Sequence, residues 1–202
     1  ASQYLLTATE VKAAIPLVLA TLGMAAAADR VYVYEHHPHE PSGALAMSMR
    51  YEWVRPGIAP SITQPHWQNQ TYSDLGVERW HEAFSRKQAI RGKLQDFPAV
   101  EQQLLAIDGI LSILMVPVFI DSHLWGYIGF DACREERDWT ANDESILVAI
   151  AVMLGGAINR QQTEDQMCYQ AFHDSLTGLP NRAFFNQQLP LAITKAQQTK
   201  KL

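Results

Sequence analysis

This sequence of 202 residues has little cysteine, few charged residues and no block of one charge sign. Its two cysteines, Cys133 and Cys168, lack the Cys-x-x-Cys spacing of metal sites, which argues against a disulfide framework and favours a reducing compartment. The 16 Lys and Arg and 21 Asp and Glu are interspersed, which argues against nucleic acid or an anionic membrane as a partner. We therefore expect a cytoplasmic protein that does not bind nucleic acid.

Long runs of strongly apolar residues are also missing. The most apolar stretch, residues 11–28, carries Lys12 and Pro16 and consists largely of alanine, so it falls short of the roughly 20 apolar residues of a membrane span. It also lacks the features of a secretory signal. We expect a buried or dimer-forming helix here and no membrane contact from these residues. Because the chain begins at Ala1 rather than Met, we expect it to come from a longer protein.

What is present is a globular composition, with 48% apolar residues and a length that suits one core plus an appendage. Apolar spacing of three and four predicts helices, and alternation with β-branched and aromatic residues predicts strands. Asp121–Ser122–His123 separates two apolar runs at hairpin length. The predicted helices are residues 9–28, 75–85, 100–107 and 142–172, and the predicted strands are residues 30–34, 44–54, 89–93, 110–120 and 124–131.

The last predicted helix changes character midway, because residues 146–158 are largely apolar and residues 159–166 are almost wholly polar. Leu147, Leu154 and Cys168 follow one seven-residue step, and Ile150 and Ala157 follow a second. Two interpretations fit this pattern equally well: a parallel dimeric linker, or a single solvated connecting helix.

The second half of the chain contains the runs Gly109–Val118 and Leu124–Asp131, followed by Trp139–Thr140 before Asp143–Glu144. By these runs, residues 5–160 resemble the GAF family. The resemblance implies an α+β fold, a PAS-related antiparallel sheet with helices and a long C-terminal linker helix. Gly126 and Gly129, inside a predicted strand, indicate close approach of another backbone or an aromatic ring, and Pro117 indicates a bulge or an edge position.

By the same resemblance, a small pocket closes between the sheet and residues 56–108. Aromatic residues there are candidate lining residues, and two charged residues on the second strand are candidate polar contacts. The alternative is that these aromatic side chains simply complete the core. The candidates are Arg50, Glu52, Trp67, Tyr72, Trp80, His81 and Phe84.

GAF domains that bind known ligands share short sequence motifs, and these can be compared with this sequence. Bilin-binding members share a Cys–His pair, and neither cysteine here is followed by histidine. Cyclic-nucleotide members share an Asn–Lys pair, which Asp131–Ala132 replaces, although Trp139 and the following Asp143–Glu144 match their second feature. We interpret His36, His37 and His39 as solvated loop residues rather than metal ligands, because their spacing fits no common zinc site.

The C-terminal segment, residues 171–185, contains the pattern Asp-x-Leu-Thr-Gly-Leu-x-Asn-Arg, formed by Asp174, Leu176, Thr177, Gly178, Leu179, Asn181 and Arg182. This pattern resembles the start of a GGDEF domain, the diguanylate cyclase fold, at each fixed position. Residues 182–195 then predict an amphipathic helix.

Such cyclases join two GTP molecules with the help of bound metal. In the family, the groups for Mg²⁺ and GTP follow this motif, beyond Leu202. We therefore expect these residues themselves to need no cofactor and to make no cyclic di-GMP, whereas the parent protein makes it with Mg²⁺ and GTP.

The expected organisation is a GAF sensor at residues 1–158, a helical linker at 159–172 and the opening of a GGDEF domain at 173–202. We expect a sensory module of a bacterial cyclic di-GMP signalling protein that binds an unknown small molecule and forms a homodimer through its terminal helices. One alternative is a ligand-free scaffold that only dimerises the cyclase. Another is a redox enzyme on the GAF fold, for which Cys133 and Cys168 form a poor pair.

Overall fold

The computed structural model describes residues 11–40, 42–174 and 177–185. The chain divides into two compact units, Ala1–Ile158 and Asn159–Leu202. Predicted helical residues 9 and 10, Leu176 of the GGDEF-like motif and most of the helix predicted at 182–195 lie outside the described residues; of that helix, residues 182–185 are described and are helical.

Within these described ranges, the first unit contains a six-stranded antiparallel sheet with the strand order β3-β2-β1-β6-β5-β4. The strands are β1 (Arg30–Pro38), β2 (Leu45–Val54), β3 (Gln70–Thr71), β4 (Ile90–Lys93), β5 (Ser112–Ile120) and β6 (His123–Ala132). The predicted hairpin is confirmed as β5 and β6, and β6 pairs on its other side with β1, nearly 100 residues away in sequence. The two central strands therefore come from opposite ends of the domain, and the α+β class is confirmed.

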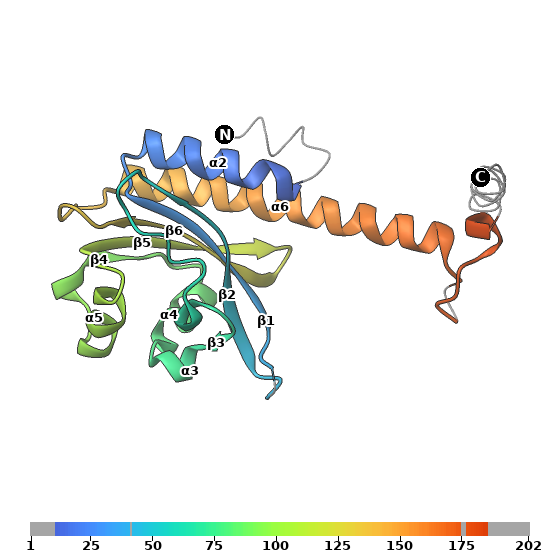
Figure 1. Cartoon of the computed structure of the whole chain (residues 1–202), viewed down its shortest axis with the longest axis horizontal. Coiled ribbons are helices and arrows are strands. Elements are labelled where there is room, and N and C mark those ends of the chain that lie inside the picture. Colours follow the sequence, from blue (N-terminus) through green and yellow to red (C-terminus); the bar gives the residue numbers. More distant parts are fainter. Residues whose placement is uncertain (1–10, 41, 175–176, 186–202) are drawn as a thin grey trace, which may run out of the picture. The chain divides into compact units, whose positions relative to one another are not determined.

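One face of the sheet is covered by α2 (Val11–Ala25) and the first part of α6 (Ala141–Phe172), which lie side by side (Figure 1). Val31 and Val33 point to this face because strand side chains alternate, and they pack with Leu147 and Leu154 of α6. The helix predicted at residues 142–172 is thereby confirmed as one continuous element.

The opposite face carries α3 (Tyr72–Leu75), α4 (Glu78–Ser85) and α5 (Ala99–Ala106), together with short 3₁₀ turns at Pro65–Trp67 and Leu94–Asp96 (Figure 1). The single helix predicted at residues 75–85 was wrong at its start. Gly76 ends α3 in the left-handed conformation, with φ of 67°, and α4 begins only at Glu78. A glycine in that conformation is a usual helix stop, and it separates the two helices here.

Two glycines of β6 have the close neighbours that the sequence predicts. A Cβ atom on Gly126 would lie 2.0 Å from the carbonyl oxygen of Tyr34, and one on Gly129 would lie 2.6 Å from the Tyr32 ring. Pro117 lies beyond the four residues of β5 that pair with β4, and one residue before a register shift in the β5–β6 ladder. Both expectations for these positions are confirmed.

The predicted seven-residue pattern in α6 has a different meaning in the structure. Leu147, Ile150, Leu154 and Ala157 are buried against the sheet within one chain, so their spacing reflects the domain core and they are not available to a partner. The exposed apolar side chains in this part of α6 include Val148 and Val152. Among the described residues, α6 is also the one helix long and apolar enough to cross a membrane by length and composition, but much of its apolar surface belongs to this core.

Candidate ligand cavity

A small cavity lies between the sheet and the short helices of the opposite layer. Its free volume is about 20 Å³, which is room for roughly one water molecule. Strands β1, β2, β5 and β6 supply one wall, and residues from the 3₁₀ turn at Pro65–Trp67 to Ile110, just before β5, supply the other. The lining residues are Arg30, Tyr32, Tyr34, Met49, Trp67, Trp80, Leu105, Asp108, Ile110, Met115, Tyr127 and Asp131.

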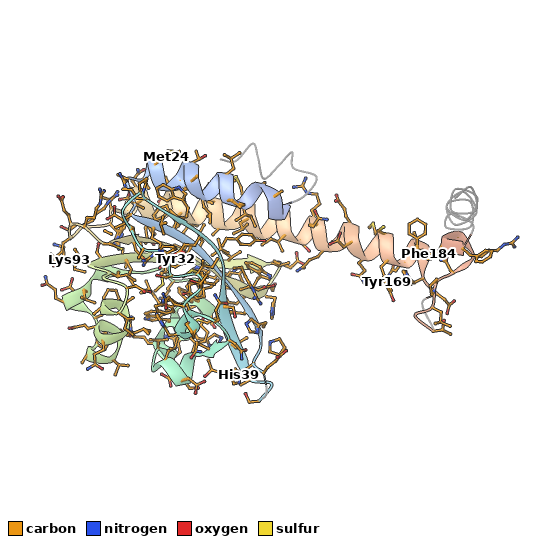
Figure 2. All side chains as sticks on the ribbon, in the orientation of Figure 1. Met24, Tyr32, His39, Lys93, Tyr169 and Phe184 are labelled. Atoms are coloured by element: carbon orange, nitrogen blue, oxygen red, sulfur yellow. The ribbon has the colours of Figure 1, made fainter. Side chains whose placement is uncertain are left out.

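Aromatic rings make up much of this lining. The Tyr34 ring stacks on Tyr127, with centroids 4.7 Å apart and planes at 12°. It meets Trp67 and Tyr32 edge to face at 6.0 and 5.6 Å. Tyr32 lies at the centre of the domain, on β1 (Figure 2). These contacts fix the rings in place, so the cavity has preformed walls.

A buried network of charged side chains forms part of the cavity wall. The β1–β6 register places Arg30 directly opposite Asp131, and Nη1 of Arg30 donates to Oδ2 of Asp131 at 3.0 Å. Nη2 of Arg30 donates to the carbonyl of Ala59 at 3.1 Å, and Nε lies 3.1 Å from Oε1 of Glu52. All three charged side chains are at most 3% exposed. One guanidinium therefore faces two carboxylates away from water.

Glu52 also holds the loop that follows β2. Its carboxylate accepts hydrogen bonds from the backbone N–H groups of Ser61 and Ile62 at 2.9 to 3.0 Å. The loop over this end of the sheet is thus tied to the same network that contains Arg30.

Asp131 has an unusual environment for a carboxylate. It is 1% exposed, and Oδ1 makes no hydrogen bond within the part of the chain that the structure describes. Burial raises the pKa of Asp131 from 3.8 to about 6, although Arg30 and the nearby Tyr32 hydroxyl oppose the rise. Among the described residues, Oδ1 therefore makes no hydrogen bond of its own on the cavity wall, and the Tyr32 hydroxyl is a further donor close to this carboxylate.

Asp108 brings a second carboxylate to the cavity. Its Oδ2 accepts a short hydrogen bond from Nε1 of Trp67 and lies 3.7 Å from Nε2 of His66. The Asp108 side chain is 10% exposed. Carboxylates therefore line the cavity at two places, and Arg30 supplies the one arginine or lysine among its lining residues.

The sequence-predicted candidates are divided by the structure. Trp67 and Trp80 line the cavity, and Trp80 is oriented by donating from Nε1 to Oε2 of Glu101 at 2.8 Å. Glu52 lies behind Arg30 and does not line it. Arg50 sits at a bulge of β2, where Val33 pairs with Tyr51 but Tyr34 pairs with Met49, and it contacts Glu35 at 2.7 Å on the exposed side.

The other three candidates pack nearby without lining the cavity. The Tyr72 hydroxyl contacts Nε2 of His36 at 2.6 Å, and the His81 ring lies 5.2 Å from the Tyr72 ring. Phe84 stacks on the back of Tyr127, with centroids 5.0 Å apart. These residues support the aromatic walls from outside.

Sequence reasoning missed the cavity residues contributed by the sheet, above all Arg30, Tyr32, Tyr34 and Asp131. One signal was present: a charged residue begins β1 and another interrupts the apolar end of β6. Charged residues at inward-facing strand positions are rarely fully buried unless they are paired. Arg30 and Asp131 were therefore candidates for a pair, but nothing local in the sequence joins them.

The interpretation of the histidine cluster was wrong for His36. It lies in β1 with both ring nitrogens engaged, Nδ1 with the Leu124 carbonyl at 3.2 Å and Nε2 with the Tyr72 hydroxyl. Burial lowers the pKa of His36 from 6.5 to about 4. His37 also belongs to β1, and its Nε2 contacts Oγ of Ser48 at 2.7 Å. No group of three His, Cys, Asp or Glu side chains suited to a metal occurs among the described residues.

Cys133 and Cys168 lie in different units, and both are free thiols. Burial raises the pKa of Cys133 to about 12. The thiolate is the reactive form of cysteine, so Cys133 is protonated and poorly nucleophilic at neutral pH.

In the second unit, the GGDEF-like motif forms a closed turn after α6. The Asp174 carboxylate accepts from N and Oγ1 of Thr177 at 2.9 and 2.8 Å, and Gly178 has a φ of 69°. Oδ1 of Asn181 then accepts from the N–H groups of Ala183 and Phe184, which caps the next helical turn, while its Nδ2 donates to the carbonyl of Ala171. Arg182 and Leu179 are exposed. The polar motif residues therefore form a compact hydrogen-bonded turn between the end of α6 and the helical residues 182–185.

Comparison with known proteins gives one family and several relatives. The family model for the GAF domain matches residues 10–158. A curated relative from Methanothrix harundinacea, "Methanogenesis regulatory histidine kinase FilI", is 39% identical over 163 residues, covering 81% of this chain and 18% of the relative. The chain spans less than a fifth of the length of the curated relatives that it matches.

Solved structures show the same fold. The photoproduct state of GAF3 from Slr1393 of Synechocystis sp. PCC6803 superposes with a TM-score of 0.64 at 22% identity, covering 78% of this chain and 99% of that one. The blue-light absorbing form of the Thermosynechococcus elongatus PixJ GAF domain gives 0.65 at 19% identity, covering 78% and 90%.

Proposed function

The chain belongs to the GAF domain family, and from this premise we propose that its first unit is a sensory domain whose cavity binds a small molecule and controls an output domain that makes cyclic di-GMP. The observation that carries the sensory part is the buried network at Asp131. A core that served only as a scaffold gains nothing from an enclosed carboxylate oxygen without a donor, because such a group destabilises the fold. A ligand that supplies the donor removes that penalty.

The proposed output rests on the turn at residues 174–182. Its Asp, Thr, Gly and Asn residues match the start of a GGDEF domain, and each has a defined role in the local hydrogen bonding. The GTP and Mg²⁺ needed for cyclic di-GMP synthesis would bind in the remainder of that domain. We accordingly assign residues 1–158 to the sensor, 159–172 to a helical linker and 173–202 to the opening of the output domain.

A second candidate output is a histidine kinase, which the name of the relative from Methanothrix harundinacea favours. The two outputs use different nucleotides, so they are separable by experiment. In either case we propose a cytoplasmic homodimer, joined through α2 and α6, in which occupancy of the cavity alters the linker helix. A ligand-free dimerising scaffold remains the alternative to a sensor.

The test uses the full-length parent protein. Incubation with GTP and Mg²⁺, followed by mass spectrometry of the products, should show cyclic di-GMP, and incubation with ATP should show no phosphorylated histidine. The cavity variant Asp131→Asn should change the rate of synthesis at least several-fold. Glu35→Gln is the matched control, because Glu35 pairs with Arg50 at the surface. Histidine phosphorylation without cyclic di-GMP would establish the kinase instead, and equal rates in all variants would favour the scaffold.

A further inference from the structure

We propose that the cavity binds a small ammonium-type cation, either ammonium or methylammonium, between Asp131 and the aromatic walls. This inference rests on the proposed function, because it names the chemical class of ligand for the same sensory site. Charge, an unpartnered acceptor, cavity size and wall chemistry all point to it.

The charge of the site is negative. The charged residues that line the cavity are Arg30, Asp131 and Asp108, so one guanidinium faces two carboxylates, and the buried Glu52 behind Arg30 adds a third carboxylate. Charges enclosed in a protein are strongly unfavourable unless they are compensated. A cation entering the cavity provides that compensation, whereas an anion increases the imbalance.

The acceptor is in place. Asp131 lines the cavity, and Oδ2 is already engaged by Arg30. Oδ1 makes no hydrogen bond within the described residues, and the Tyr32 hydroxyl is a further group that lowers the pKa of this carboxylate by hydrogen bonding. An ammonium group donates hydrogen bonds in several directions and carries a positive charge, so it meets both needs of this carboxylate. A water molecule would donate one hydrogen bond but leave the charge uncompensated.

Arg30 does not turn the site into one for anions. Its Nη1 and Nη2 donate to Asp131 and the Ala59 carbonyl, and its Nε lies 3.1 Å from Oε1 of Glu52 as an ion pair without hydrogen-bond geometry. The guanidinium is thus already shared between two carboxylates and one carbonyl. An incoming carboxylate or phosphate would compete with these partners and meet Asp108 as well.

The size of the cavity and the chemistry of its walls favour an ammonium-type cation over a larger ligand or a metal ion. A free volume of about 20 Å³ admits a particle of the size of one water molecule, which fits ammonium, and methylammonium needs only a small displacement of the lining side chains. The π systems of Tyr, Trp and Phe attract ammonium-type cations, and the attraction is stronger in a desolvated site. Tyr34 and Trp67 supply these rings. Metal ions are disfavoured, because the described residues hold no cluster of ligands for one.

The binding test uses the 202-residue protein and four solutes at matched ionic strength or concentration: ammonium chloride, methylammonium chloride, sodium chloride and methanol. Methanol is the neutral counterpart of methylammonium. At 100 times the dissociation constant, either ammonium-type cation should raise the melting temperature by about 5 to 10 °C. Sodium chloride and methanol should not. A rise that is equal with methanol or with sodium chloride overturns the proposal, and this comparison needs no variant.

Calorimetric titration of variants then locates the site. Asp131→Asn keeps the shape of the side chain but removes its charge, so it should raise the dissociation constant for methylammonium at least tenfold. Glu35→Gln should bind as the wild type does. Equal affinity in Asp131→Asn overturns the assignment.

The two proposals fail in distinguishable ways. If no ammonium-type cation binds but Asp131→Asn still alters cyclic di-GMP synthesis by the parent protein, the cation is wrong and the sensory function stands. If methylammonium binds at Asp131 but leaves the synthesis rate unchanged, the site stands and the sensory role of the cavity is wrong.

Discussion

The hydrogen bonds and burial of His36, near the cavity, make its protonation state depend on folding. The Leu124 carbonyl can only accept, so Nδ1 of His36 is the donor and Nε2 accepts from the Tyr72 hydroxyl. This arrangement uses the neutral ring, and burial excludes the charged one, which lowers the pKa to about 4. Between about pH 6.5 and pH 4, the His36 ring therefore stays neutral in the folded state but is protonated in the unfolded chain.

A pH dependence of stability follows from His36. Its contribution is fully present above about pH 6.5 and is lost as the pH falls towards 4, because only the unfolded state gains the proton over that interval. Chemical denaturation between pH 7 and 4 should show that the wild type loses up to about 3 kcal/mol more than His36→Gln. Parallel pH profiles for the two proteins would contradict this role of the ring.

Single residues also show where prediction from the sequence ended. Trp67 and Trp80 were found because aromatic side chains stand out in a polar, proline-containing segment. Arg30 and Asp131 were not, because they are 101 residues apart and meet only through the β1–β6 register. Arg50 was expected beside Glu52 by simple alternation, but the β2 bulge breaks the alternation at that residue.

At the scale of elements, the close contact between α6 and β5 depends on one of two adjacent glycines. A Cβ atom on Gly155 would lie 2.1 Å from the backbone carbonyl oxygen of Phe119, whereas one on Gly156 would meet nothing within 4 Å. The helix can approach the strand this closely only because residue 155 has no side chain.

The two glycines make a matched pair of variants. Gly155→Ala should lower the free energy of unfolding by about 1 to 3 kcal/mol, because a backbone carbonyl cannot move aside as a side chain can. Gly156→Ala should raise it by about 0.5 to 1 kcal/mol, since alanine favours a helix over glycine. Urea denaturation of both variants measures the difference, and destabilisation of equal size would show that helix packing at residue 155 is looser than described.

Helices and strands were predictable from the sequence where the apolar spacing and the flanking turn residues indicate the same element. The β5–β6 hairpin and the continuous α6 were predicted because their apolar runs and turn residues agree. The meaning of the α6 repeat was not, since spacings of three and four residues describe any buried helix face, whether it packs on its own sheet or on another chain. Leu147 and Leu154 pack on their own sheet.

At the scale of the whole molecule, the helical layer of the first unit leaves apolar side chains exposed. Leu17 and Met24 of α2 and Val148 and Val152 of α6 are 42 to 69% exposed, and Figure 2 shows Met24 at the outer edge of this layer. Exposed apolar side chains on a helical layer are candidates for an association surface. They are the side chains through which we propose the homodimer forms.

A substitution on this surface tests the dimer. Val152→Glu should weaken self-association at least tenfold without unfolding the domain, because Val152 is 69% exposed and supports no core contact. Ile107→Glu, which alters an equally apolar exposed residue beyond α5, is the control and should leave association unchanged. Analytical ultracentrifugation over a concentration series gives both constants. A wild-type protein that stays monomeric throughout would refute the proposed homodimer.

The fold as a whole could be assigned from the sequence, because the helix and strand pattern and the GAF resemblance agree on one α+β architecture. The interior of the cavity could not, since its character depends on which inward-facing residues meet across the sheet. Tyr32, Tyr34 and Tyr127 each look like ordinary core residues when they are taken alone.

The contact between β5 and α6 at Gly155 has a mechanical consequence. Met115 lines the cavity, and four residues later the Phe119 carbonyl touches the backbone of α6 at Gly155. An extended strand hardly stretches, since each residue already spans about 3.3 Å of it. The segment from Met115 to Phe119 is therefore a stiff connection, with the cavity at one end and α6 at the other. We expect that a displacement of the Met115 backbone would reach α6 through the main chain of β5.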